Sequence, residues 1–137
     1  MTASSSILMM LDTNTVSHIV RGRPPALARL AKVPMADVCI SVITEGEIRF
    51  GLAKRPQATR LHQIVHEFLQ RVEIKPWDST TAIVYGNLRA ALEGSGKNVG
   101  ALDLLIGAHA LALGCKLITN DGGFGEIGNL KTEDWTV

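Results

Sequence analysis

Four acidic residues stand at comparable places in the secondary structure that the sequence predicts. Asp12 and Asp121 each follow an apolar segment of strand length, whereas Glu47 and Asp103 lie near the starts of predicted helices. If the strands run parallel, these positions meet at one rim of the sheet. Crowded carboxylates raise each other's pKa unless a divalent cation neutralises them. We therefore predict an acidic cluster that binds metal.

The chemistry of such a cluster follows from its ligands. Oxygen-only ligands select hard ions such as Mg²⁺ or Mn²⁺. An ion of this kind polarises a phosphoryl oxygen and lowers the pKa of a bound water, so hydrolysis of a phosphodiester is the natural reaction.

Each acid also has a purely structural interpretation. Thr44 and Glu47 match a capping box, and Asp12 and Asp103 could each stabilise the start of a helix. Whether the four positions converge depends on the order of the strands in the sheet, which spacing alone does not establish. The residues by themselves leave both interpretations open.

The elements that would position these acids alternate along the chain. Strands are predicted over residues 7–11, 38–42, 72–74 and 116–119, with a last edge strand within 130–137. Helices are predicted from 12–14 to Gly22, then over 26–32, 44–53, from Pro56 to Leu69, 79–93 and 101–113. This alternation predicts an α/β fold with a parallel sheet and helices on both of its faces.

Length and composition indicate a single globular domain over residues 1–137, with a disordered leader at its start, residues 1–6. Hydrophobic residues make up 46% of the 137 residues and charged residues 20%, which is a globular composition. No apolar run approaches the roughly 20 residues that span a bilayer, and no signal peptide is apparent. We expect a cytoplasmic protein with Cys39 and Cys115 reduced. Translation could begin naturally at Met9 or Met10.

Charge is unevenly distributed although the net charge is only +1. The first 60 residues carry eight Lys or Arg and four Asp or Glu, whereas the remainder carries six and nine. The eight basic residues could contact phosphates, although an ordinary solvated surface explains them equally well. They are Arg21, Arg23, Arg29, Lys32, Arg49, Lys54, Arg55 and Arg60.

Four motifs in order resemble those of VapC-type PIN domains, the toxin half of bacterial type II toxin–antitoxin pairs. They are Met10 to Asn14, Ser41 to Gly51, Gly100 to Asp103 and Ile118 to Phe124, and the ending Glu133 to Trp135 is also similar. The resemblance covers essentially the whole chain, and an ordered set is far more specific than one motif. It implies a PIN-like three-layer α/β/α sandwich with a central, mostly parallel sheet.

The same resemblance assigns roles to residues. It implies that one or two Mg²⁺ or Mn²⁺ ions are coordinated by Asp12, Glu47, Asp103 and Asp121. Asn14 matches a polar position beside the site, and Thr119 is expected to hydrogen-bond a ligand carboxylate. The fourth acidic position, Asp121, varies in this family, so Asp121 need not contact the metal directly. Asn120 could instead orient water or substrate.

The resemblance also implies an activity and partners. It implies a metal-dependent endoribonuclease that cleaves RNA, with tRNA as the expected substrate. We expect cleavage at bases exposed in an RNA loop, because paired RNA hides its sequence in a deep groove. A homodimer and a VapB-type antitoxin are expected, with DNA contacted only through the antitoxin. No membrane partner is expected.

Several other residues are candidates with weaker support. His62 and His66 have the i, i+4 spacing of zinc-binding helices but no third ligand. Glu45, two residues before Glu47, should point to a different side of its helix. His109 is expected to pack or to face a partner chain.

Three alternative functions remain from the residues alone. A receiver-like phosphoacceptor would have adjacent acids after its first strand and a lysine near the end of its last core strand. A haloacid-dehalogenase-like phosphatase would have Asp where Asn14 stands. A non-catalytic PIN-like domain that only binds RNA or protein would not need all four acids.

Overall fold

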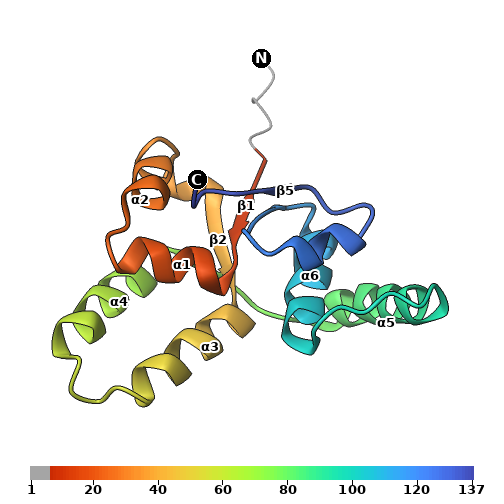
Figure 1. Cartoon of the computed structure of the whole chain (residues 1–137), viewed down its shortest axis with the longest axis horizontal. Helices are drawn as coiled ribbons and strands as arrows, with labels where there is room; N and C mark the ends of the chain where they lie inside the picture. Colours follow the sequence, from red (N-terminus) through yellow and green to blue (C-terminus); the bar gives the residue numbers. More distant parts are fainter. Residues whose placement is uncertain (1–6) are drawn as a thin grey trace.

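The structure is a computed structural model that describes residues 7–137. Five strands form one parallel sheet in the order β3-β2-β1-β4-β5, and helices cover both of its faces (Figure 1). This confirms the predicted three-layer α/β/α architecture. The disordered leader expected at residues 1–6 lies outside the described residues.

The strands are short and central, and the helices carry most of the chain. The strands are β1 (Met9–Leu11), β2 (Val38–Ser41), β3 (Glu73–Lys75), β4 (Lys116–Ile118) and β5 (Thr132–Glu133). The α-helices are α1 (Thr13–Val20), α2 (Pro24–Ala31), α3 (Val42–Ala53), α4 (Thr59–Arg71), α5 (Ser79–Gly94) and α6 (Ala101–Leu113). Two 3-10 helices complete the fold, η1 (Met35–Asp37) and η2 (Gly122–Glu126).

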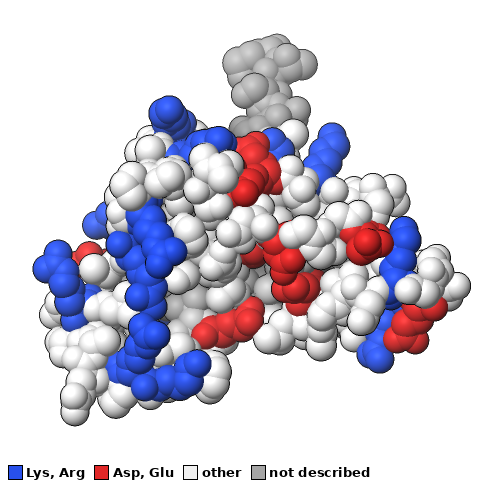
Figure 2. Space-filling view, viewed as in Figure 1, with Lys and Arg blue, Asp and Glu red and all other residues white. Residues whose placement is uncertain are grey.

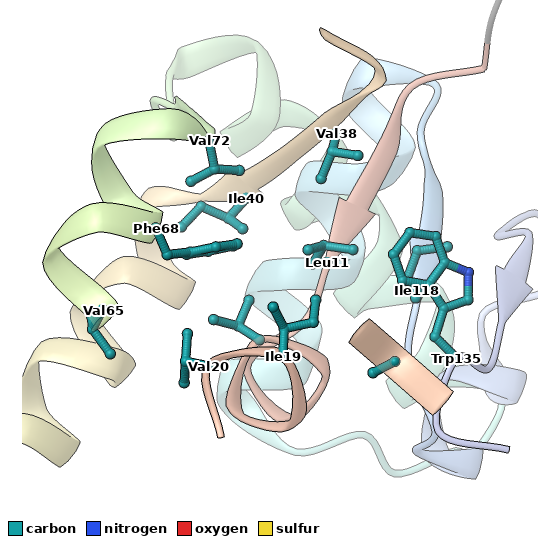
Figure 3. Packing of buried hydrophobic residues seen from close by; sticks show 12 residues of the cluster. Leu11, Ile19, Val20, Val38, Ile40, Val65, Phe68, Val72, Ile118 and Trp135 are labelled. Atoms are coloured by element: carbon teal, nitrogen blue, oxygen red, sulfur yellow. The ribbon is translucent and has the colours of Figure 1, made fainter. Parts of the chain in front are cut away.

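Alternate side chains of the central strands enter two separate hydrophobic layers. Leu11, Ile40 and Ile118 pack with residues of α1, α2 and α4, as Figure 3 shows. Their neighbours Met10, Cys39 and Leu117 pack on the other face with residues of α5, α6 and η2. Burial on both faces explains why these strands are continuously apolar in the sequence.

Strand order reverses at the centre of the sheet. After β1 the chain forms α1 and α2, which make the crossover connection, and returns as β2 on one side of β1. On the other side, β1 pairs with β4. Leu11 and Ile118 are paired in register, and the Asp12 amide donates to the Ile118 carbonyl at 3.0 Å. The residues that follow β1 and β4 therefore emerge together, at the switch point where parallel α/β sheets bind ligands.

Two predicted helix starts are wrong. α3 begins at Val42, with the Ser41 hydroxyl accepting from the Ile43 amide at 3.1 Å, so Thr44 is inside the helix and forms no capping box with Glu47. α4 begins at Thr59 and not at Pro56, because a turn closed by the Ala58 amide and the Arg55 carbonyl occupies the intervening residues. Neither shift changes which layer the helices occupy.

Other expectations concern single residues. Cys39 and Cys115 are free and buried. Among residues 7–137, no helix combines the length and the apolar character needed to cross a membrane.

Candidate active site

Asp12 is held by the first turn of α1. Its carboxylate accepts a hydrogen bond from the Thr15 amide at 2.8 Å and so caps the helix. The Thr15 hydroxyl donates to the Ile118 carbonyl at 3.0 Å, which ties α1 to the end of β4. Asp12 is 5% exposed, so a fixed carboxylate stands at the centre of the sheet rim.

Glu47 reaches the same rim from α3. The Thr13 hydroxyl donates to Glu47 Oε1 at 2.5 Å and joins the start of α1 to the middle of α3. Glu45 instead pairs with Arg49 at 2.8 Å. The prediction that Glu45 points elsewhere is confirmed, and Arg49 contacts that carboxylate.

The loop after β4 supplies Asn120 and Asp121. The Asn14 amide donates to Asn120 Oδ1 at 2.7 Å, which bridges α1 and this loop. Asp121 Oδ1 accepts from the Gly123 amide at 2.8 Å and caps η2. The Thr119 hydroxyl accepts a hydrogen bond from the Asp121 amide at 3.0 Å. Within residues 7–137, Thr119 does not form the expected hydrogen bond to a carboxylate.

Asp103 completes the set from the first turn of α6. Burial, followed by the neighbouring Asp121 carboxylate, raises the pKa of Asp103 to about 6. The charges of Asp12 and Glu47 contribute to the same rise. Burial and the neighbouring carboxylates therefore favour the protonated form of Asp103.

All four predicted acids line a single pocket of ≈ 500 Å³. The remaining lining residues are Thr13, Asn14, Ser17, Ile106 and Asn120. Within residues 7–137, no three acidic, histidine or cysteine side chains are close enough to hold one ion as they stand. The carboxylates of Glu47 and Asp121 accept hydrogen bonds from the Thr13 hydroxyl and the Gly123 amide.

The chemistry of the lining suits a hard divalent cation. Its acidic donors are carboxylate oxygens, the ligands that Mg²⁺ and Mn²⁺ prefer. In the part of the chain that the structure describes, none of the four acids forms an ion pair. Their negative charge is therefore left uncompensated by the protein itself, and a bound cation would compensate it.

The histidines contribute elsewhere. His62 Nε2 contacts the Arg55 carbonyl at 2.9 Å, and His66 is exposed. His109 is buried against the sheet with its Nδ1 2.8 Å from the Ser41 hydroxyl, and burial lowers its pKa. The expectation that His109 packs within the protein is confirmed.

The two tryptophans anchor elements of the fold. The Trp77 indole donates to the Leu105 carbonyl at 3.0 Å. Trp135 is buried and donates to the Glu133 carboxylate at 2.6 Å.

Two polar residues of the pocket were missed by the sequence reasoning, besides the apolar Ile106. Thr13 and Ser17 stand on α1 four residues apart, and both line the acidic pocket. Thr13 lies inside the first motif, so its neighbours signalled its importance, but its contact with Glu47 depends on the packing of α3. Ser17 carries no signal in the sequence beyond its helical spacing from Thr13.

Comparisons with known proteins agree with this fold. The PIN domain family matches residues 9–130. The tRNA(fMet)-specific endonuclease VapC of Salmonella typhimurium is 33% identical over 92% of this chain and 96% of that protein. Ribonuclease VapC2 of Rickettsia felis is 34% identical over 94% of this chain and 98% of that protein.

Solved structures give the same result. A chain of VapBC2 from Rickettsia felis, bound to a DNA fragment from its promoter, has a TM-score of 0.86 at 31% identity and covers 94% of this chain and 99% of that one. A chain of DNA-bound VapBC from Salmonella typhimurium also has a TM-score of 0.86, at 32% identity, covering 94% and 98%. The chain therefore belongs to the PIN-domain family, among its VapC-type members.

Proposed function

We propose that the chain is the ribonuclease toxin of a VapBC toxin–antitoxin pair and that it hydrolyses RNA phosphodiesters with the help of Mg²⁺ or Mn²⁺. The observation that carries the proposal is the pocket at the strand switch point, lined by four carboxylates that form no ion pair within residues 7–137. The names of the related ribonucleases support the same activity.

The proposed ligands are Asp12, Glu47, Asp103 and Asp121, holding one or two ions. A bound ion would supply Lewis-acid polarisation of the phosphate and a water of lowered pKa. Thr13 holds Glu47 in place through its hydroxyl. Asn120 accepts a hydrogen bond from Asn14 and is proposed to orient water or the phosphate oxygens.

The proposed reaction needs no covalent intermediate. Water adds to phosphorus in line with the leaving oxygen of the ribose, and the bond between phosphorus and that oxygen breaks. The products are a 5′-phosphate and a 3′-hydroxyl. Orientation and charge neutralisation are the contributions required of the protein.

We propose tRNA as the substrate. Relatives from Salmonella typhimurium and Shigella flexneri carry the name tRNA(fMet)-specific endonuclease. A loop of a folded RNA presents unpaired bases and an accessible backbone to an open pocket. Such a substrate places the activity in the cytoplasm.

A VapB-type antitoxin is the proposed protein partner, because the structural neighbours are chains of VapBC complexes. In the proposed assembly the toxin is a homodimer and touches DNA only through the antitoxin. The acidic pocket would attract a cationic side chain of an inhibitor for the same electrostatic reason that it attracts a metal ion.

Cleavage of total bacterial tRNA and rRNA by antitoxin-free protein tests the proposal. We expect discrete fragments with Mg²⁺ or Mn²⁺, and intact RNA when EDTA is added or when the protein carries Asp12→Asn. Asparagine caps helices as well as aspartate does, so this variant should stay folded. Intact RNA in every lane, from folded protein supplied with metal, would favour the alternative of a non-catalytic domain that binds RNA or protein.

A further inference from the structure

Five basic residues lie together on one side of the acidic pocket. Arg21 and Arg23 follow α1, Lys54 and Arg55 follow α3, and Arg60 lies in the first turn of α4. We call these five residues the basic groove. Figure 2 shows a column of Lys and Arg side chains beside the acidic group on this face of the molecule. All five side chains are exposed.

The basic groove is continuous with the acidic pocket. A hollow of ≈ 170 Å³ shares Thr13, Ser17 and Glu47 with the acidic pocket and is bordered by Arg21, Lys54 and Arg55. Beyond it, a wider depression of ≈ 760 Å³ shares Arg21 with this hollow and adds Arg23 and Arg60. A chain molecule could thus pass from the carboxylates to the basic residues without leaving the surface.

The positive charge of the groove is not balanced by the protein. Over residues 7–137, the five residues take part in no ion pair, whereas Arg29, Arg49 and Arg89 do. Two of them contact uncharged side chains of the protein. Arg21 donates to the Ser17 hydroxyl at 3.2 Å, and Lys54 Nζ lies 4.5 Å from the centre of the Phe50 ring. An external anion is therefore the partner that the groove favours.

The floor of the hollow has a different character from its rim. Val16, Val20, Leu52 and Val65 line it below the basic side chains. An apolar floor with a cationic rim suits a nucleotide, whose base is flat and whose phosphate is charged. An acidic peptide would match the rim as well, but it would not explain why the groove leads directly to a site for phosphodiester chemistry.

We propose that the RNA strand on one side of the cleaved bond lies in the basic groove, with consecutive phosphates at Arg21, Lys54 and Arg55 and a base against the apolar floor. This inference rests on the proposed ribonuclease function. Because the groove meets the acidic pocket at Thr13, Ser17 and Glu47, a strand held in it would set which phosphate reaches the carboxylates. The five residues are positioning residues and take no part in bond cleavage.

The test compares two doubly substituted proteins that have the same net charge. One carries Arg21→Ala and Arg55→Ala, and the matched control carries Lys32→Ala and Lys131→Ala, two exposed residues outside the groove that form no ion pair within residues 7–137. Steady-state cleavage of one RNA gives KM and kcat. Binding of the same RNA over a range of salt is measured with Asp12→Asn present in every protein, so that the RNA stays intact.

We expect the groove variant to raise KM with kcat close to that of the unsubstituted protein. The slope of log affinity against log salt should fall by about 1.4, or about 0.7 for each phosphate that the protein no longer neutralises. The control should change neither quantity by as much. Lys54→Ala, a smaller change at an exposed side chain, should show half of the effect on the slope and guards against misfolding of the double variant.

Three results would overturn the inference. The first is equal salt slopes for the groove variant and the control. The second is a loss in kcat without a change in KM. The third is unchanged RNA binding combined with loss of binding to a co-purified antitoxin, which would assign the groove to a protein partner. If the unsubstituted protein cleaves nothing, the proposed function fails, but the salt slopes still decide whether the groove binds RNA.

Discussion

At the scale of single residues, the site is built from side chains that serve the fold and the pocket together. Asp12 caps α1 and lines the pocket, and Asp121 caps η2 and lines the same pocket. The structural and functional interpretations left open by the sequence are thus compatible for these two residues. Glu47 is different, because its hydrogen bond comes from the Thr13 side chain and supports no helix end.

Glu47 and Glu45 allow a matched comparison on one helix. Glu47→Gln removes a proposed ligand charge and should reduce RNA cleavage by more than about 100-fold, since changes to groups that merely surround a metal ligand already cost about 10–100-fold. Glu45→Gln disrupts only an exposed ion pair with Arg49 and should leave cleavage nearly unchanged. Equal activities of the two variants in the same cleavage assay would exclude Glu47 from the site.

Thr13→Val tests how Glu47 is held in place. The substitution removes the hydroxyl that donates to Glu47 while keeping the shape of the side chain. We expect cleavage and Mn²⁺ affinity to fall together by about 10-fold, within the range found when a partner of a metal ligand is removed. Titration calorimetry with Mn²⁺ reads the affinity; unchanged affinity would mean that Thr13 has no part in metal binding.

At the scale of elements, the sequence predicts which strands and helices form more reliably than it predicts where each one begins and ends. The continuous apolar segments and the helical periodicity predicted each strand and helix that carries the site. The starts of α3 and α4 were missed because Ser41 supplies a side-chain cap at the end of a strand, and because Pro56 fits a turn as well as it fits a helix start. Convergence of the four acids could not be predicted from the residues alone, because it depends on the strand order and no local sequence pattern specifies that order.

β5 offers a pH-dependent test of the sheet edge. Lys116, then the Trp135 indole, then Arg29 hold the pKa of Glu133 below its ordinary value of 4.5. A lowered pKa means that the charged form stabilises the fold above pH 4.5, and that this contribution is lost as the pH falls through the lowered pKa.

Glu133→Gln should therefore lower the free energy of unfolding at neutral pH by up to about 1 kcal/mol, the usual limit for a partly exposed ion pair. The difference from the unsubstituted protein should shrink in acid. Urea unfolding at several pH values gives these free energies. Glu126→Gln serves as the control, because Glu126 forms an exposed ion pair with Lys97 at the longer distance of 3.9 Å. A difference that grows in acid would contradict the assignment of Glu133 as the charged anchor of β5.

At the scale of the whole molecule, a net charge of +1 conceals two surfaces of opposite sign. The excess of basic residues in the first 60 was visible in the sequence. Which of these residues form ion pairs and which lie in the basic groove was not visible in the sequence. It depends on how the end of α1 meets the segment that runs from the end of α3 to the start of α4. The four acids, in contrast, were all identified from motifs and were found to line one pocket.

The proposed homodimer is a prediction at this scale. Large hydrophobic side chains remain exposed on α3, α5 and α6, among them Phe50, Ile83 and Leu113, and their burial between two copies would be favourable. Sedimentation equilibrium should give twice the chain mass of 14.7 kDa. A single-chain mass at all concentrations would contradict the dimer.

Four carboxylates from separate parts of the chain are proposed to hold a catalytic divalent cation, and anomalous diffraction from crystals containing Mn²⁺ tests this most directly. We predict an Mn²⁺ peak in the acidic pocket, with oxygens of Asp12, Glu47, Asp103 or Asp121 at roughly 2.0–2.2 Å, near the distances of hard divalent ions. An empty pocket at saturating Mn²⁺, or a peak held by other residues, would contradict it.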